Sequence, residues 1–369
     1  MMNSVTRIGR GGIVMTGLVI VALGSGTAVG EGMWPLEFAD TIREAGGGVS
    51  FVFGAKRPFP QCHASTVAET PDGGLVAAWF GGTAEKDNDV GIWFATFDGE
   101  KWSAPERAAK VDDTPHWNPV LFRDAEGTIH LFFKIGPEIP FWQTYWMQSK
   151  DGKTWSAPQE LVAGDKGGRG PVKNKAIILS DGTWLAPAST EHEGWHSFAD
   201  RSTDGGKTWS RSENFAFDPA EMEGKGIIQP TFWESEPGQV HALMRSTAGK
   251  IFRTDSEDFG KTWTPIYDSG LPNNNSGVDA VRLKDGRVLL VYNPVPGNWK
   301  ARTPIDLAIS EDNGKTWKTV AHLEADADLR SEFSYPAIIQ MESGDVVITY
   351  TYQRERVRCW QIPLAALQG

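Results

Sequence analysis

The stretch SEDNGKTWK at residues 310–318 joins a polar turn to a large aromatic residue, and it decides the fold because it recurs. Two more full copies, STDGGKTWS at 202–210 and SEDFGKTWT at 256–264, are accompanied by a shortened one, SKDGKTWS at 149–156, and a weaker one, TFDGEKWS at 96–103. The tryptophans of the five copies are spaced by 53, 54, 54 and 54 residues. Self-similarity at such a period is typical of a propeller or a solenoid.

Short runs of strand-forming residues fill each period, as in GGLVAAWFGG at 73–82 and GTIHLFFKIG at 127–136. No stretch keeps an amphipathic helical period for three turns, so each period is predicted to hold about four strands, which make one blade. A sixth blade without the motif is expected from about Phe333 to Trp360. The run GVSFVF at 48–53 is predicted to pair with it and to close the ring, since an open array would leave sheet edges unpaired. The predicted fold class is an all-β, six-bladed propeller.

The turn motif itself is interpreted as scaffold. Its Ser, Thr and Asp side chains can bond the backbone of their own turn, and its Gly can take a positive φ. Its Trp is predicted to pack where neighbouring blades meet. Nothing in this arrangement requires a substrate.

The first thirty residues have a different composition from the rest of the chain. Arg7 and Arg10 precede the apolar run GGIVMTGLVIVALG, and small residues follow up to Gly30. This pattern predicts a secretory signal peptide over 1–30, with an uncleaved anchor as the alternative, and a single propeller domain over 31–369. We therefore expect an exported monomer, periplasmic or extracellular.

Without Arg7 and Arg10 the net charge is −13, from 34 basic and 47 acidic residues. So acidic a protein should repel nucleic acid and anionic membranes, and neither is expected as a partner. No metal site and no cofactor are predicted, since the chain has no HExxH, CxxC, EF-hand or dinucleotide pattern. Cys62 and Cys359 leave one disulfide open as a possibility.

The pattern S-x-D-x-G-x-T-W at this spacing is the Asp-box, or BNR repeat, and the chain resembles the sialidase superfamily. The resemblance implies three arginines that hold a substrate carboxylate, an Asp that acts as acid and a Tyr nucleophile. A phenol suits an anionic sugar, because it avoids the repulsion that a carboxylate nucleophile would meet. The expected partner is thus a glycan or glycoconjugate.

The resemblance places the family's functional residues at particular positions. Arg57 in KRPFPQ, Arg245 in LMRSTAG and Arg302 in ARTPID would hold the substrate. Asp87 or Asp89 in GTAEKDND would be the acid, and Tyr335 in FSYPAII the nucleophile.

One position departs from the family. The Glu that activates the Tyr is replaced by Gln229 in GIIQPTFWE, and an amide can orient a phenol but cannot accept its proton. Glu234 and Glu332 are candidates to substitute for it. His63, in QCHAST, is a further candidate acid or base, because histidine titrates near neutral pH.

Other polar residues begin or end the strands expected to line the channel. Those predicted to contact substrate are His116, Asn118, Lys173 and Glu191. The loop tryptophans Trp142, Trp146, Trp195 and Trp299 are candidates to stack on sugar rings, with core packing as the alternative.

Three functions remain open. The first is a secreted exo-glycosidase that releases a terminal acidic sugar, with sialic acid as the family default. The second is a uronate-directed polysaccharide lyase, in which the arginines acidify an α-proton and Tyr335 or His63 removes it. The third is a carbohydrate-binding propeller without catalysis, because a fold alone does not determine a function.

Overall fold

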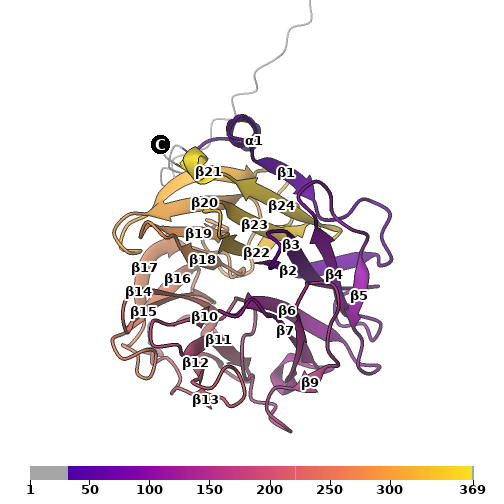
Figure 1. Cartoon of the computed structure of the whole chain (residues 1–369). Helices are drawn as coiled ribbons and strands as arrows, with labels where there is room; N and C mark the ends of the chain where they lie inside the picture. Colours follow the sequence, from indigo (N-terminus) through magenta and orange to yellow (C-terminus); the bar gives the residue numbers. More distant parts are fainter. Residues whose placement is uncertain (1–31, 221, 368–369) are drawn as a thin grey trace, which may run out of the picture. The chain divides into compact units, whose positions relative to one another are not determined.

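The computed structural model describes residues 32–220 and 222–367, so the predicted signal peptide lies outside the described residues. Six four-stranded antiparallel sheets are arranged around a common axis (Figure 1), and the predicted all-β, six-bladed propeller is confirmed. Within this part of the chain, no helix has the length and apolarity needed to span a membrane.

Each sheet is one blade, and the first strand of each blade, called here the inner strand, lies nearest the axis. The strands of blades one to three are β2 (Gln61–Glu69), β3 (Leu75–Gly82), β4 (Gly91–Phe97), β5 (Glu106–Ala109); β6 (His116–Arg123), β7 (Ile129–Ile135), β8 (Gln143–Ser149), β9 (Gln159–Glu160); β10 (Ile177–Ile178), β11 (Trp184–Glu191), β12 (Trp195–Ser202), β13 (Ser210–Arg211). Those of blades four to six are β14 (Ile227–Glu236), β15 (Gln239–Ser246), β16 (Lys250–Ser256), β17 (Tyr267–Pro272); β18 (Asp279–Arg282), β19 (Val288–Tyr292), β20 (Ile305–Ser310), β21 (Lys318–Glu324); β22 (Phe333–Gln340), β23 (Val346–Tyr352), β24 (Arg356–Ile362) and β1 (Gly48–Phe51).

The ring closes through β1, which pairs with β24 from Gly48 opposite Gln361 to Phe51 opposite Arg358. The predicted pairing of 48–53 with the last blade is therefore confirmed. A helix that the sequence analysis did not predict, α1 (Pro35–Glu44), precedes β1, and its Phe38 and Ile42 are buried between blades five and six. Two short 3₁₀ helices, η1 (Ile139–Phe141) and η2 (Leu364–Leu367), complete the elements.

The Asp-box turns join the third strand to the fourth within a blade, as the turn at 310–318 illustrates. Asp312 accepts hydrogen bonds from the Thr316 amide at 2.8 Å and the Thr316 hydroxyl at 2.6 Å, while Ser310 Oγ accepts one from the Gly314 amide at 2.8 Å. Gly314 has a φ of +75°, which a residue with a Cβ rarely adopts. The Trp317 ring packs against a cluster drawn from blades four and five. The turn is thus scaffold, as predicted.

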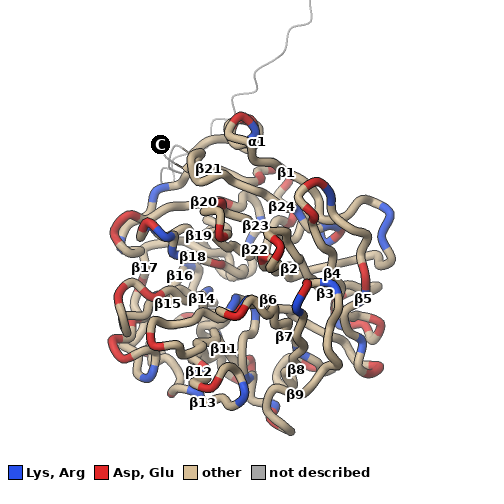
Figure 2. The backbone as a smooth tube through the Cα atoms, in the orientation of Figure 1, with Lys and Arg blue, Asp and Glu red and all other residues tan. Residues whose placement is uncertain are grey.

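The apolar core of the described residues is divided among the seams between blades. Each of the six large clusters takes its side chains from two neighbouring blades, so that every sheet is covered on both faces. Cys62 and Cys359 lie in the seam of blades six and one as free thiols. Acidic residues mark many of the outer turns (Figure 2), in keeping with the negative net charge. No group of three His, Cys, Asp or Glu side chains within residues 32–220 and 222–367 is arranged to hold a metal ion.

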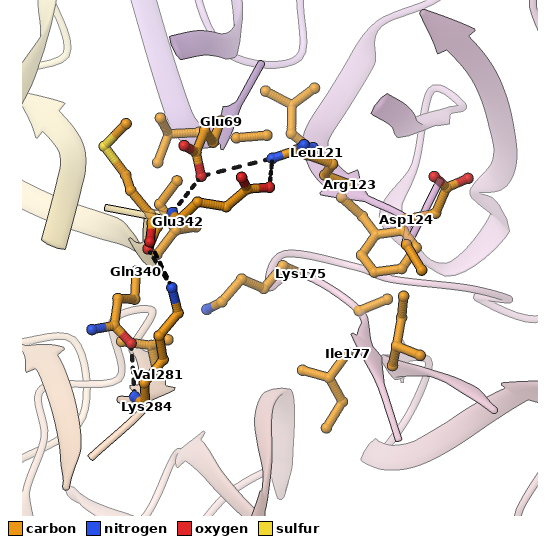
Figure 3. A pocket seen from close by; sticks show the side chains of 18 residues that line it. Glu69, Leu121, Arg123, Asp124, Lys175, Ile177, Val281, Lys284, Gln340 and Glu342 are labelled. Atoms are coloured by element: carbon orange, nitrogen blue, oxygen red, sulfur yellow. Dashed lines mark hydrogen bonds and ion pairs between the residues drawn. The ribbon is translucent and has the colours of Figure 1, made fainter. Parts of the chain in front are cut away.

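A cavity of about 470 Å³ lies where the inner strands end (Figure 3). Its charged groups link different blades: Arg123 pairs with Glu342 at 2.8 Å and lies 3.7 Å from Glu69, and Lys284 donates to the Glu342 carbonyl at 2.8 Å. These contacts connect blades one, two, five and six at this mouth of the ring.

Candidate active site

The opposite mouth is shaped by β-bulges in four inner strands. At each bulge a residue with a side chain adopts a positive φ: Ala64 at 54°, Asn118 at 40°, Gln229 at 56° and Tyr335 at 55°. Such a backbone costs about 1–3 kcal/mol and persists only where the surroundings enforce it. Because a bulge re-aims the side chain that it carries, the fold turns four side chains at matching positions of four blades.

Tyr335 lies among three cations. Arg245 Nη1 donates to the Tyr335 hydroxyl at 2.7 Å, and the guanidinium carbons of Arg245 and Arg302 lie 5.7 and 5.5 Å from the centre of its ring. The Lys173 ammonium is 6.0 Å from the same centre. The structure therefore brings together Tyr335, Arg245 and Arg302, the three residues that the sequence places on blades four, five and six.

Arg245 is 2% exposed and held by neutral groups. Its Nε donates to Asn275 Oδ1 at 2.8 Å, and its Nη1 donates to Gln229 Oε1 at 3.1 Å as well as to the tyrosine. Asn275 is fixed in turn by Asn298, whose Oδ1 accepts from it at 2.8 Å. Because Gln229 is an amide, it orients the guanidinium without neutralising its charge.

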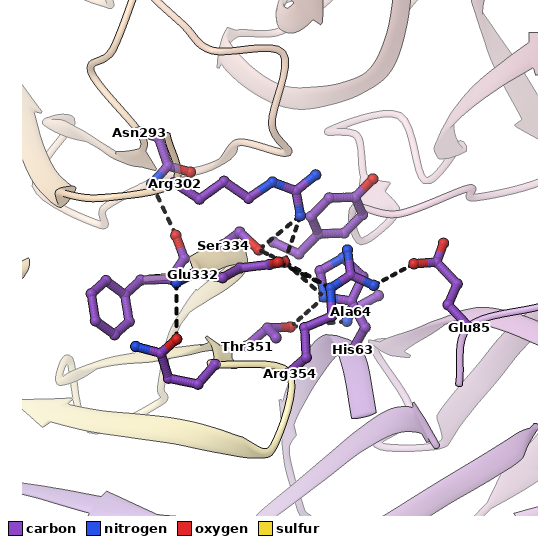
Figure 4. Close-up of polar contacts among 12 residues, drawn as sticks. His63, Ala64, Glu85, Asn293, Arg302, Glu332, Ser334, Thr351 and Arg354 are labelled. Carbon is purple, nitrogen blue, oxygen red and sulfur yellow. Dashed lines mark hydrogen bonds and ion pairs between the residues drawn. The ribbon is translucent and has the colours of Figure 1, made fainter. Parts of the chain in front are cut away.

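Arg302 and Arg354 share one carboxylate (Figure 4). Glu332 Oε1 accepts from Arg302 Nη1 at 2.6 Å, and Glu332 accepts from Arg354 Nε at 3.0 and 3.1 Å. Arg354 also binds Glu85 through Nη1. Burial acts to raise the pKa of Glu332, but the two arginines outweigh it and hold that pKa below its ordinary value. Glu332 is therefore an ionised link between two cations.

The His63 ring lies against the ring of Tyr335, the nucleophile candidate, with the two planes tilted by 48°. Its ring centre is 4.2 Å from that of Tyr335, and its Nδ1 lies 2.9 Å from Thr351 Oγ1 and 3.9 Å from Glu332. Burial, assisted by the charges of Arg354 and other nearby cations, holds the pKa of His63 well below its usual value. Among the described residues its Nε2 has no hydrogen-bond partner. His63 is therefore a neutral imidazole with one nitrogen available.

Lys173 supports Tyr335 from the channel side. Its buried ammonium donates to Asn174 Oδ1 at 2.8 Å, to the Val278 carbonyl at 3.0 Å and to the Pro336 carbonyl. A Cβ on Gly277 would lie 2.9 Å from the Lys173 side chain, so only glycine fits there without displacing it. Burial lowers the pKa of Lys173 to about 7. Lys173 thus lies behind the tyrosine and fixes the backbone of its bulge.

Arg57 makes its contacts outside this cluster. It donates to the carbonyls of Ala55 at 3.1 Å and Pro60 at 2.9 Å, and it lies 4.0 Å from Glu355. The structure thus does not join Arg57 to Arg245 and Arg302 through any described contact. The third guanidinium in the contact network is that of Arg354.

The predicted acids also lie outside the cluster of described contacts. Asp89 accepts from the Thr83 amide at 2.9 Å and the Thr83 hydroxyl at 2.8 Å, which fixes the loop after β3. Asp87 is exposed, with no side-chain hydrogen bond to the described residues. The carboxylate of this loop that joins the network is Glu85.

The remaining predicted residues differ in their surroundings. His116 is committed to its own loop: its Nε2 accepts from the Val111 amide at 2.8 Å, its Nδ1 donates to the Thr114 carbonyl at 2.9 Å, and burial lowers its pKa to about 4. Asn118 is buried at its bulge. Glu191 ends β11, half-buried.

Two of the four loop tryptophans lie over Arg245. The rings of Trp195 and Trp299 are 5.6 and 5.8 Å from its guanidinium carbon and meet edge to face at 6.3 Å. Trp299 is 62% exposed, whereas Trp142 is buried. Trp146 packs against His130, with ring centres 5.7 Å apart.

Three contact residues were missed by the sequence analysis: Arg354, Glu85 and Asn275. Arg354 lies in the tight turn between β23 and β24, where it has a φ of 54°. A charged turn such as QRER is ordinary on a protein surface, so it gave no functional signal. The acidic loop GTAEKDND was identified, but its spacing does not indicate which carboxylate turns inward.

The propeller, its Asp-box turns and the cations around Tyr335 define a protein of the sialidase type. The BNR repeat-like domain family matches residues 73–348, which is more than half of the chain. The chain therefore belongs to the BNR repeat family of the sialidase superfamily.

Individual relatives agree with this assignment. The chain is 29% identical over 224 residues to a sialidase of Bacteroides fragilis (strain YCH46), covering 54% of this chain and 37% of the relative, so it spans well under half of that protein. The solved structure of Hadza microbial sialidase Hz136 has a TM-score of 0.72 at 19% identity, covering 86% of this chain and 69% of the other. A Dyadobacter fermentans protein of unknown function has a TM-score of 0.68 at 19% identity, covering 86% and 100%. The two structural likenesses bear on the fold alone.

Proposed function

We propose that this protein is an exported, monomeric exo-glycosidase that hydrolyses a terminal acidic sugar from a glycan, with sialic acid as the first candidate. One observation carries the proposal: Arg245, Arg302 and Arg354 each keep Nη2 without a hydrogen-bond partner among the described residues, close to Tyr335 or to its network. Guanidinium groups bind carboxylates through parallel hydrogen bonds, so three open donors form a suitable site for an anionic sugar. The similarity to a Bacteroides fragilis sialidase supports the same substrate class.

Tyr335 would attack the anomeric carbon. A phenol needs a proton acceptor, and Gln229 cannot serve as one. His63 is the neutral base nearest to the ring, with Nε2 open, and we assign it this role. The exposed Trp299 would contact the next sugar of the glycan, because an aromatic face packs on the apolar face of a sugar.

A second candidate, uronate lysis, is favoured by the same pair of residues. A neutral His63 beside Tyr335, with an amide at position 229, suits abstraction of an α-proton as well as it suits activation of a nucleophile. The arginines would then stabilise the enolate that forms.

The test is to incubate the mature protein with sialosides and with uronate-bearing glycans, while measuring free reducing sugar and ultraviolet absorbance. Release of a saturated acidic sugar supports hydrolysis, and an absorbing unsaturated product supports lysis. In the hydrolytic case Tyr335→Phe should lower kcat by about a thousandfold or more and change the affinity for the product sugar little, because the hydroxyl acts in the chemical step. Ligand affinity without any product would leave only the binding function.

A further inference from the structure

The inference made here rests on the function proposed above. Hydrolysis of a glycoside needs a group that protonates the leaving oxygen. The sequence assigned that role to Asp87 or Asp89, which make no described contact with the cluster around Tyr335. Besides Glu332, which is committed to Arg302 and Arg354, two carboxyl groups lie near this cluster: Glu85, from the loop after β3, and Glu191, from the end of β11.

The two carboxyl groups have opposite surroundings. Glu85 is paired with Arg354. Glu191 has no hydrogen bond or ion pair with the described residues. Burial raises the pKa of Glu191, although the charges of Arg245 and Lys225 oppose the shift. Burial therefore favours the protonated form of Glu191.

The position of Glu191 agrees with a role near Arg245, one of the arginines proposed to bind the acidic sugar. It is paired with Trp195 across the β11–β12 hairpin. Side chains of directly opposed residues lie on the same face of a sheet, so the carboxyl group lies on the face that carries the Trp195 ring. That ring lies 5.6 Å from the guanidinium carbon of Arg245. Glu191 also lines a small hollow together with Trp142 and Gly168.

We propose that Glu191 is the proton donor to the leaving group. In the first step Tyr335 Oη bonds to the anomeric carbon and its proton passes to His63 Nε2. The bond from that carbon to the leaving oxygen breaks, and the oxygen takes the proton of Glu191. In the second step water adds to the anomeric carbon and gives a proton to Glu191, while Tyr335 departs and recovers its own proton from His63. The sum is one glycosidic bond cleaved by one water.

The test compares two substrates of the same acidic sugar: a 4-nitrophenyl glycoside, whose leaving group needs little protonation, and a disaccharide, whose leaving group needs it. Glu191→Gln should reduce kcat on the disaccharide by about a hundredfold or more, and on the nitrophenyl glycoside by less than about tenfold. The alkaline limb of the disaccharide pH profile should disappear. Glu193→Gln, an exposed neighbour in the same hairpin, is the matched control and should behave as the wild type.

The outcomes separate the two proposals. Equal losses on both substrates, or no loss on either, would overturn the role of Glu191 while leaving the function intact. A wild type that releases no acidic sugar from either substrate would overturn the function and this role together. Melting temperatures of both variants show whether a loss reflects folding, and Glu191→Asp, which keeps a carboxyl group, should retain more disaccharide activity than Glu191→Gln.

Discussion

At the scale of single residues, the basic groups around Tyr335 outnumber the carboxylates before substrate arrives. Glu332 pairs with Arg302 and Arg354, and Glu85 pairs with Arg354, so ion pairs hold two of the three guanidinium groups. Neutral groups hold Arg245, and each of the three keeps Nη2 without a partner among the described residues. Ion pairs of this kind cost free energy to bury, but they fix geometry. The arrangement therefore presents oriented donors to an anion, and Arg245 is the one guanidinium of the three that has no carboxylate partner among the described residues.

Separate replacement of Arg354 and of Arg57 by alanine shows which of the two is the third arginine that binds the substrate. Arg354→Ala removes an open donor and frees Glu332 to bind Arg302 more fully, so KM for an acidic sugar should rise about tenfold or more. Steady-state kinetics on both variants provide the measurement. If Arg57→Ala raises KM and Arg354→Ala does not, the assignment made from the sequence is correct and this one is wrong.

The sequence was informative about residues on strands and less so about those in turns. Tyr335, Gln229 and His63 lie at fixed places on inner strands, and the repeat period locates such places. Arg57 and Arg354 lie in irregular segments, where the backbone path rather than the spacing decides where a guanidinium points. No pattern in one chain predicts that path.

At the scale of elements, the Asp-box turns and the β-bulges have different roles. The Asp-box turns hold the outer strands, and the bulges aim side chains at the mouth. The first is encoded within nine residues and was predicted in full. The second was not, because a bulge is visible only in the register of two paired strands. The helix α1 was missed for another reason: with ten residues it is too short to keep an amphipathic period over three full turns.

The Asp-box of blade five should stabilise the fold in a pH-dependent manner. Hydrogen bonds from Thr316 and Ser310 lower the pKa of Asp312 to about 2. A carboxyl group with a lowered folded pKa stabilises above its unfolded value of about 4, and this contribution is lost as the pH falls towards 2. Asp312→Ala should therefore lower the melting temperature by about 2 °C or more at pH 6 and by less near pH 2.

Thermal unfolding at both pH values measures this effect. Lys315→Ala, which changes an exposed side chain of the same turn, is the control and should leave the melting temperature unchanged. An equal deficit of Asp312→Ala at both pH values would mean that the carboxylate is not what stabilises the turn.

At the scale of the whole molecule, the ring is closed by the pairing of β1 with β24, which joins distant parts of the chain. The repeat period predicted the number of blades, and the lone strand at 48–53 predicted how the ring closes. The ion pairs at the other mouth, around Arg123 and Glu342, were not predicted, because they lie in turns of different blades.

Disrupting the pairing of β1 with β24 should lower the stability of the fold by more than the loss of one hydrogen bond would. Val52 donates to the Val357 carbonyl at 2.9 Å, and the alternation of an antiparallel ladder makes Ser50 the next residue that bonds β24. Ser50→Pro should lower the melting temperature by about 5 °C or more relative to Ser50→Ala, since proline has no amide hydrogen and distorts the strand. Circular dichroism during heating measures this, and equal values for the two variants would mean that β1 does not hold the ring closed.

The pairing of β1 with β24 also affects how this protein folds during its synthesis. Residues 48–51 are made well before their partners at 358–361, so during synthesis β1 stays unpaired until those partners emerge. Five blades can assemble from strands that are neighbours in the chain, but the sixth combines β22, β23 and β24 with β1, which precedes the other five blades. Contacts between such distant segments form slowly, and an exposed strand edge invites pairing with another chain. The pairing of β1 with β24 is thus the folding step at which the newly made chain is most exposed to strand pairing with another chain.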